Sequence, residues 1–363
     1  MNVLTRRLLT VALLAGLSFG GRAQAQNQPA VAEPKNIGEL VAAVRKEGGN
    51  LNIAWASAMN GGAAGIKRFG DDIEAKYHIR LNIQYTPLAI PGGAFENQIM
   101  QEVKANQPSS SDVLFNVHLA TEAPYFQSVD FRRYDPELPA NFAYFQDRAF
   151  PVTTIFEGFT YNSKLIPADK APKSLADLLK PEWKGKIATP PYEGIEGAYV
   201  GLPQVLGKDG MTRFYTAFSK QLGAVMRCGS DDRIVSGEVP IFGIDCGDYA
   251  ARIAQRSGQP LASVYPKEGA GLLFFAQGIP KTAAHPYAAR LLIAYLLSKE
   301  GQRALWDVMG TDNYRLPGSH MGAVVADAKK RGVKVVEVFG LDIAHPELLD
   351  YEQTIDALVN KSQ

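Results

Sequence analysis

The chain has 363 residues, with 38 lysines and arginines against 37 aspartates and glutamates and a formal net charge of +1 at pH 7. Because charges of both signs are interspersed, the sequence lacks the basic surface typical of nucleic-acid-binding proteins, and we expect no nucleic-acid partner. The length suffices for two units that each have a hydrophobic core.

The N-terminus has the three parts of a secretory signal peptide. Arg6 and Arg7 form a positive region, residues 8–19 are apolar, and residues 23–25 supply a small-x-small cleavage pattern. We expect cleavage after Ala25, which leaves 338 of the 363 residues, removes three arginines and no acid, and changes the net charge from +1 to −2. The apolar stretch is shorter than the roughly 20 residues of a membrane-spanning helix, so an uncleaved anchor is disfavoured. Either the general secretory or the twin-arginine route remains open.

Two cysteines, Cys228 and Cys246, are present in the whole chain. Disulfides persist in the compartments that exported proteins reach, so we expect these two to form a bridge. On the chain-entropy model such a short loop contributes on the order of 3 kcal/mol. Two separate buried thiols are the alternative, and a metal site on this pair is disfavoured because no partner stands at ligand spacing.

The first part of the chain alternates strands and helices. Asn36, with Glu39 three residues later, predicts a helix start. Periodicity then predicts a strand at 51–55, a helix through Tyr77, a strand at 79–85, a helix at 95–104 and a strand at 112–116. This order is typical of an α/β layer with parallel strands.

The second part continues the alternation with different punctuation. Ser174 and Asp177 form a capping-box pattern that opens a short helix. The further predictions are a β-rich run at 153–161, a strand after Trp183, helices at 210–220, 249–257 and 287–297, strands at 239–244 and 270–276, and two helical patterns near the C-terminus.

Three stretches resemble the extracellular solute-binding proteins of ABC importers, in the branch that includes ferric-iron binders. The first is Tyr161–Ile166 (YNSKLI) with Leu178–Ala188 (LLKPEWKGKIA), and the second is Ser236–Val239 (SGEV) with the apolar strand after it. The third is His285–Arg290 (HPYAAR), ending in Leu297–Gln302 (LSKEGQ). Each stretch alone has ordinary structural uses, and their order and spacing together carry the resemblance.

The resemblance implies an α/β, two-lobed type II periplasmic-binding-protein fold with hinge strands at 156–161 and 272–276. After a leader and first helix at 26–49, lobe 1 would take residues 50–156 and 277–320, and lobe 2 residues 157–276. Residues 321–363 would form C-terminal helices that pack across the lobes. The implied protein is a periplasmic monomer that closes on a small molecule or ion and delivers it to an inner-membrane ABC permease.

Ligands of open α/β sheets bind beyond the carboxyl ends of strands, near helix N-termini, and this rule selects the candidate loops. Ser57 and Asn60 follow the first strand, where they either grip a ligand or cap the next helix. Asn116 and His118 follow the strand at 112–116, and His118 is either a ligand contact or a structural histidine.

In lobe 2, the family contacts its ligand near Tyr192 and Glu193, although Tyr192 has the alternative of packing at the lobe surface. Ferric binders of the family carry two adjacent tyrosines where this chain has Asp248 and Tyr249. The pair of phenolates is therefore broken, which favours an anionic or oxygen-rich organic solute over ferric iron. If iron binds, the metal ligands would be Tyr249, Asp248, Glu193 and His118.

Two more places remain candidates. Ser230 and Arg233 precede the 239–244 strand, and Arg233 either pairs with a carboxylate or phosphate of the solute or forms a surface ion pair with Asp231 or Asp232. Tyr314 and Arg315 either reach the cleft or pack at the lobe edge.

A secreted hydrolase is the competing class. The sequence has no Gly-x-Ser-x-Gly, His-Glu-x-x-His or Cys-x-x-Cys motif, and its five histidines are scattered. We therefore expect a binding protein without catalytic residues or cofactors.

Overall fold

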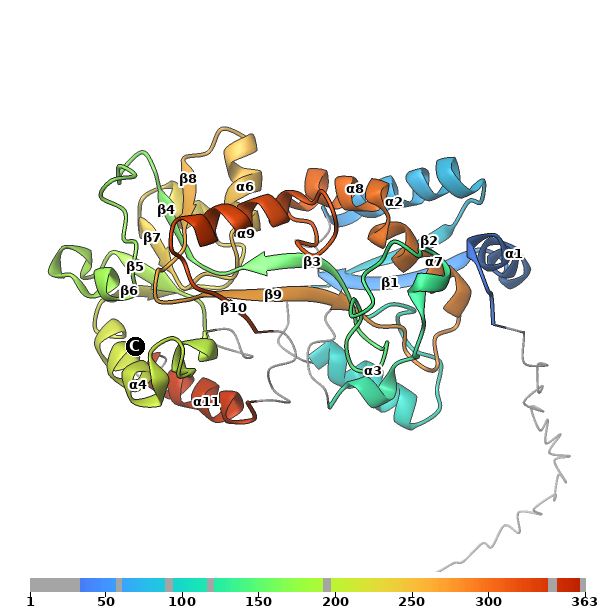
Figure 1. The fold of residues 1–363 in the computed structure, drawn as a ribbon, viewed down its shortest axis with the longest axis horizontal. Coiled ribbons are helices and arrows are strands. Elements are labelled where there is room, and N and C mark those ends of the chain that lie inside the picture. The colour runs from blue at the N-terminus through green and yellow to red at the C-terminus, as the bar shows by residue number, and fades with distance from the viewer. Residues whose placement is uncertain are drawn as a thin grey trace, which may run out of the picture. The chain divides into compact units, whose positions relative to one another are not determined.

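The computed structural model describes residues 33–56, 61–88, 94–115, 121–191, 197–338 and 345–359, and Figure 1 shows their arrangement. The first predicted element is confirmed. Helix α1 (Ile37–Glu47) has Asn36 as its N-cap, whose side-chain oxygen accepts the Glu39 N–H at 3.0 Å. Its apolar face is buried, and the chain leaves the helix through Gly48 in the left-handed conformation.

The strands form three sheets. β1 and β2 pair alone, the second sheet has the order β10-β9-β3, and the third has the order β6-β5-β7-β4-β8. The strands are β1 (Asn50–Ala56), β2 (Asn82–Leu88), β3 (Phe150–Phe156), β4 (Phe159–Asn162), β5 (Ile187–Thr189), β6 (Leu222–Val225), β7 (Ile241–Gly243), β8 (Leu261–Val264), β9 (Ala270–Gln277) and β10 (Val335–Glu337).

Helices cover these sheets. The α-helices after α1 are α2 (Gly62–Tyr77), α3 (Ala94–Lys104), α4 (Gly207–Phe218), α5 (Asp232–Val235), α6 (Tyr249–Arg256), α7 (Pro286–Leu297), α8 (Lys299–Met309), α9 (His320–Lys330) and α11 (Glu347–Val359). Short 3₁₀ helices are η1 (Ala123–Tyr125), η2 (Phe131–Arg133), η3 (Ala176–Leu179), η4 (Pro181–Trp183) and η5 (Ala198–Gly201).

The parallel pairings predicted from the alternating pattern are present. β1 pairs with β2 in parallel, and β5 pairs in parallel with both β6 and β7. The expected capping box also forms, because the Ser174 hydroxyl oxygen accepts the Asp177 N–H at 3.0 Å. The helix that it opens is the 3₁₀ helix η3.

The strand predicted at 79–85 begins three residues late. β2 has β1 as its partner, and β1 begins at Asn50, which pairs with Asn82. Residues 79–81 therefore have no strand beside them, and His78 ends α2 in the left-handed conformation.

The predicted strand at 112–116 is reduced to isolated bridges, Ile53 with Val113 and Leu114 with Gly278. Side chains take part of the strand's role here. The Asp112 carboxylate accepts the Asn52 N–H at 2.7 Å, and the Ser111 hydroxyl accepts the Ala54 N–H at 3.1 Å. The ladder along β1 is thus completed by side-chain oxygens instead of backbone carbonyls.

Two antiparallel strands connect the sheets. β3 pairs with β9 from Phe150 and Gln277 to Phe156 and Leu272. β3 continues through Glu157 and Gly158 into β4 of the five-stranded sheet, and β8 of that sheet leads back into β9. Figure 1 shows β3 and β9 running between the five-stranded sheet at the left and the β1–β2 pair at the right.

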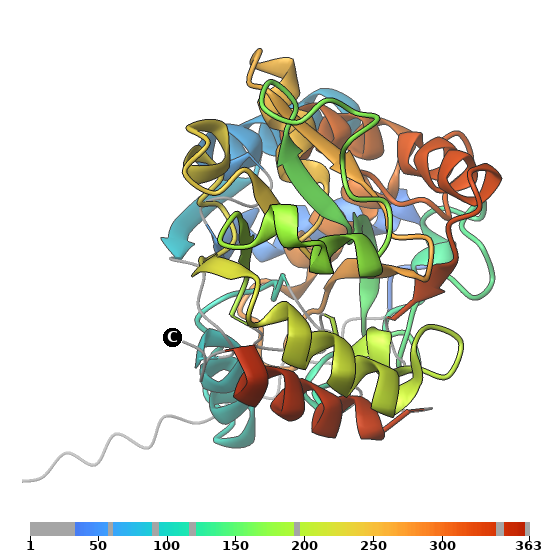
Figure 2. The same cartoon turned by 90° about the vertical axis from the view of Figure 1, so that its left-hand side faces the viewer.

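The strongly apolar helix predicted at 287–297 is the most buried one. Every residue of α7 from Ala288 to Leu297 is buried, and α7 lies against α1, α2, α8, β1 and β3. At the other end of the chain, α11 lies against α4 and η5, as Figure 2 also shows. Helix α9 packs instead on the connecting strands, through a cluster that joins Met321 and Val325 to Phe156 and Leu272.

Candidate ligand-binding site

The predicted ligand loops all follow the carboxyl ends of parallel strands. Residues 57–60 follow β1, and residues 116–120 follow the segment that bridges β1 in parallel at Val113. In the five-stranded sheet, residues 226–231 follow β6 and residues 244–248 follow β7. Since these strands are parallel within each sheet, their carboxyl ends meet at one edge, where ligands of α/β proteins bind.

Several predicted contact residues lie outside the described residues. These are Ser57, Asn60, Asn116, His118, Tyr192 and Glu193. Ser230, Arg233, Asp248, Tyr249 and both cysteines are described.

The predicted disulfide is confirmed. Cys228 and Cys246 are bonded, with their Cα atoms 5.8 Å apart. The bridge joins the loop after β6 to the loop after β7, so the two loops that hold the described candidate residues are tied together covalently.

The loop after β7 begins with a strained residue. Ile244 is buried and has a φ of 53°, in the left-handed region that β-branched side chains avoid. Such a conformation costs roughly 1–2 kcal/mol and persists only where the surroundings enforce it.

Asp245 shows what enforces it. Its carboxylate accepts the Gly158 N–H at 3.1 Å, the Thr160 hydroxyl at 2.5 Å and the Gly247 N–H at 3.0 Å. Burial raises the pKa of Asp245 to about 6, although the three hydrogen bonds act in the opposite direction. Because Gly158 lies between β3 and β4, the loop is fastened directly to a strand connection between the sheets.

Asp248 lies in an internal ion pair, where the sequence had suggested a ligand or metal contact. Its side chain is fully buried, and its two oxygens accept from the two terminal nitrogens of Arg252, one of them at 2.7 Å. The Tyr265 hydroxyl donates to the same carboxylate. Both oxygens therefore have strong partners inside the protein, which leaves Asp248 no part in our site.

Tyr249 is the first residue of α6 and remains partly exposed. Burial of the hydroxyl, with the charges of Asp231, Asp245 and Asp248, raises the pKa of Tyr249 well above its ordinary value. The phenol is therefore protonated at neutral pH and acts as a hydrogen-bond donor rather than as an anionic ligand.

An aromatic row links Tyr249 to the far side of the molecule. The Tyr249 ring meets Phe275 of β9 edge-on at 5.9 Å, Phe275 meets Phe115 at 5.1 Å, and Phe115 meets Trp55 at 5.3 Å. Trp55 and Phe115 stand next to the loops at 57–60 and 116–120. The row thus places the predicted loops of both sheets around one region.

Arg233 has a partner that the sequence did not single out. Its guanidinium donates to Glu238 at 2.5 Å, instead of pairing with Asp231 or Asp232. Ser230 lies in the turn before α5 and accepts the Arg233 N–H through its carbonyl at 3.2 Å. Arg233 is thus part of a surface ion pair, a kind that contributes little to stability.

Tyr314 and Arg315 also bind within the protein. The Tyr314 and Tyr144 hydroxyls donate to Glu337 at 2.6 Å and 2.5 Å, and the Arg315 guanidinium pairs with the same carboxylate. This cluster ties β10 to the segments before β3 and after α8.

Within the described ranges there is no group of three or more His, Cys, Asp or Glu residues that could hold a metal ion. Of the four metal ligands suggested by sequence, Glu193 and His118 lie outside those ranges, and Asp248 is bound to Arg252.

Sequence reasoning missed Asp245 and Arg252. The spacing of Asp248 and Arg252, four residues apart at a helix start, was a usable signal for the ion pair. The strained Ile244 left no trace in the sequence, because isoleucine is normal at the end of a buried strand.

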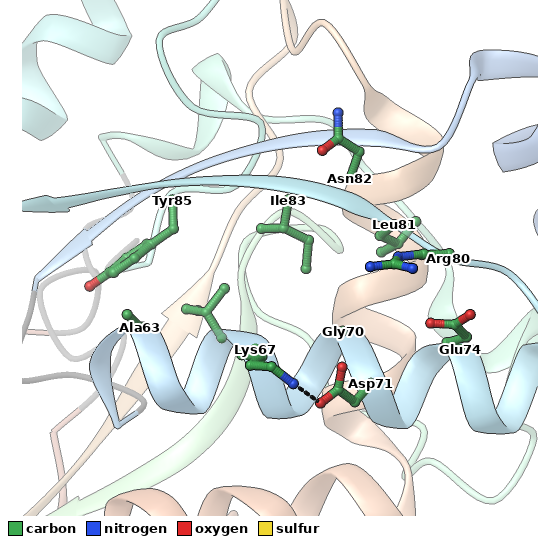
Figure 3. A pocket seen from close by; sticks show the side chains of 11 residues that line it. Ala63, Lys67, Gly70, Asp71, Glu74, Arg80, Leu81, Asn82, Ile83 and Tyr85 are labelled. Atoms are coloured by element: carbon green, nitrogen blue, oxygen red, sulfur yellow. Dashed lines mark hydrogen bonds and ion pairs between the residues drawn. The ribbon is translucent and has the colours of Figure 1, made fainter.

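A separate hollow of about 540 Å³ lies between α2 and β2, as Figure 3 shows. Its charged residues have both signs, and its Lys67–Asp71 pair, at 2.6 Å, has side chains exposed by 76% and 59%. Such an exposed pair is solvated, and the hollow is lined by none of the loops described above.

Among the residues described, no helix combines the length and the apolar character needed to cross a membrane.

Comparison with known proteins identifies the family. The model of the family "Bacterial extracellular solute-binding protein" matches residues 115–331, which is more than half of the chain. An uncharacterized protein of Haemophilus influenzae is 29% identical over 157 residues, a match that spans 41% of this chain and 45% of that relative.

Solved structures agree on the fold. The substrate-binding protein of an ABC transporter from Agrobacterium tumefaciens has a TM-score of 0.67 at 19% identity, covering 87% of this chain and 95% of that one. The apo ferric ion-binding protein A of Pasteurella haemolytica has a TM-score of 0.62 at 17% identity, covering 86% of this chain and 98% of that one. The chain therefore belongs to the bacterial extracellular solute-binding protein family and has the two-lobed α/β fold of periplasmic binding proteins.

Proposed function

We propose that this protein is the periplasmic solute-binding component of an ABC importer. After export and cleavage behind Ala25, the mature chain captures one small solute between its lobes and presents it, as a monomer, to an inner-membrane permease. Its activity is binding and release without catalysis.

One observation carries the proposal. The loop that ends in Tyr249 is bonded through Asp245 to Gly158 and Thr160, at the connection between β3 and β4. A solute that contacts Tyr249 thus acts on a loop fastened to the segment about which the lobes would turn. Differential contacts in the closed state are what a binding protein needs for solute-driven closure.

The described side chains favour an oxygen-rich organic solute over a ferric ion. Tyr249 is protonated, its neighbour Asp248 is bound to Arg252, and Asp231 contributes further negative charge near the phenol. A hard trivalent cation requires several anionic oxygens at once. The contact residues that we propose are Ser57, Asn60, Asn116, His118, Tyr192, Glu193, Ser230 and Tyr249.

A thermal-shift panel tests the function. We would use ferric citrate, spermidine, glucose 6-phosphate, glucose and malate with the mature protein. A solute at a hundredfold excess over its Kd adds about 2.7 kcal/mol of stability by mass action and raises the Tm accordingly. Tyr249→Phe should reduce the shift without lowering the Tm of the solute-free protein. If no compound of any class raised the Tm, the proposal would lose its support.

The same panel decides about iron. Coordination of ferric iron by Tyr249 requires the phenolate and would give the protein a tyrosinate-to-iron charge-transfer colour. We expect protein incubated with ferric citrate and desalted to remain colourless, and a coloured protein would revive the ferric alternative.

A further inference from the structure

Helix α6 carries two arginines in the turns after Tyr249, and the first of them is largely buried. The Arg252 side chain is 16% exposed and forms a two-point ion pair with Asp248, which is 0% exposed. Its Nε also donates to the Gly310 carbonyl at 2.5 Å. All of its polar contacts thus lie inside the protein, immediately behind Tyr249.

The contact with Gly310 joins two parts of the molecule. Gly310 ends α8 in the left-handed conformation, and α8 packs on α2, α7 and β3. Helix α6 packs on β8 of the five-stranded sheet. Gly310 approaches so closely that a Cβ there would lie 2.9 Å from the Tyr249 carbonyl oxygen.

Arg256, one turn later, contacts α8 in a different way. It donates to the carbonyls of Trp306 and Asp307 at 2.7 Å and 3.2 Å, and its guanidinium lies 4.8 Å from the centre of the Trp306 ring. Arg252 approaches the same ring at 5.5 Å. The two arginines therefore share α8 as a partner, but the ion pair with Asp248 belongs to Arg252.

We propose that Arg252 is a positioning residue of the solute site, one that fixes Tyr249 by holding Asp248 on one side and the end of α8 on the other. The proposal rests on the solute-binding function proposed above. A guanidinium suits this task because its planar fork bonds a carboxylate with two nitrogens while a third nitrogen remains free for the carbonyl. A lysine ammonium retains the charge but cannot reproduce the fork.

Three variants separate positioning from simple stabilisation. Arg252→Lys keeps a cation beside Asp248 and loses the fork. Asp248→Asn combined with Arg252→Met removes both buried charges together, so that neither is left unpaired. Arg256→Gln is the matched control, because it weakens the contact with α8 and leaves the Asp248 pair intact.

The first measurement needs no solute. Hydrogen–deuterium exchange of the intact mature protein would follow the amides of residues 245–252. We expect at least tenfold faster exchange there in Arg252→Lys and in the double variant, with the amides of α7 unchanged. Arg256→Gln should exchange within twofold of the wild type.

The second measurement is the affinity for whichever of ferric citrate, spermidine, glucose 6-phosphate, glucose and malate gives the wild type its largest Tm shift. We expect Arg252→Lys to keep the solute-free Tm within a few degrees of the wild type and to lose at least tenfold in affinity. A residue with a merely structural role would not produce this split.

Either of two results would overturn the proposal: exchange and affinity of Arg252→Lys within twofold of the wild type, or Arg256→Gln with the same losses as Arg252→Lys. If the wild type bound no member of the panel, the proposed function would fail, whereas the exchange experiment would still decide whether Arg252 holds the loop.

Discussion

Replacement of Gly158 by alanine should destabilise the protein strongly. A Cβ at this position would lie 2.5 Å from the Val264 carbonyl oxygen and 3.0 Å from the Tyr265 ring. The backbone would have to move, and overpacking of this kind costs about 1–3 kcal/mol. The Gly158 N–H and carbonyl also bond Asp245, and the loss of one buried hydrogen bond adds about 1–3 kcal/mol. We expect a total of roughly 3 kcal/mol or more.

Urea unfolding of the mature protein at pH 7 measures this difference. Gly70→Ala is the matched control, because Gly70 lies inside α2 and its Cβ would meet the flexible end of Ile83 at 3.3 Å. Alanine favours a helix interior by up to about 1 kcal/mol, so the control should be neutral or stabilising. A loss below about 1 kcal/mol for Gly158→Ala would refute the idea that close backbone approach determines the residue at this connection.

Three further predictions concern the loops and the C-terminal strand. Replacement of Cys228 and Cys246 together by serine should cost about 3 kcal/mol on the chain-entropy model, measured by thermal unfolding, and a wild-type Tm in the variant would contradict it. Asp245 has a folded pKa of about 6, raised above the ordinary 3.8, so its protonation stabilises the fold at low pH and this contribution is lost as the pH rises through 6. In Asp245→Asn, the free energy of unfolding should therefore gain roughly 3 kcal/mol relative to the wild type between pH 4 and pH 7 in urea titrations, and a pH-independent difference would count against it. Glu337→Gln leaves Arg315 without its carboxylate and should lower the free energy of unfolding by about 1–3 kcal/mol, whereas Glu352→Gln on α11 serves as a comparison on the same C-terminal segment.

The elements with long periodic patterns were predictable from the sequence. The apolar face of α2, the cap of α1 and the buried α7 all follow from local rules, because each pattern extends over three or more turns. The short strands β6, β8 and β10 were not predicted. Each has only three or four residues, and a run of that length becomes a strand through its neighbour in the sheet rather than through its own pattern.

The candidate site was predictable as a set of loops and not as a set of contacts. The rule about the carboxyl ends of strands selects the loop at 245–249 without the structure. The direction of each side chain in that loop depends on Ile244, whose left-handed backbone turns the chain. Asp248 faces Arg252 as a result, while Tyr249, the next residue, begins α6 and remains partly exposed.

The departure from two tyrosines therefore has a structural consequence. In place of one phenol the chain has an aspartate that is bound inward, and the acid recruits Arg252, which in turn contacts α8. The substitution exchanges a hard anionic ligand for an internal anchor, and the remaining phenol lies in a negative environment that keeps it protonated. A site of this kind retains a donor hydroxyl in a fixed position, which suits a solute recognised by its hydrogen-bond acceptors better than a bare trivalent cation.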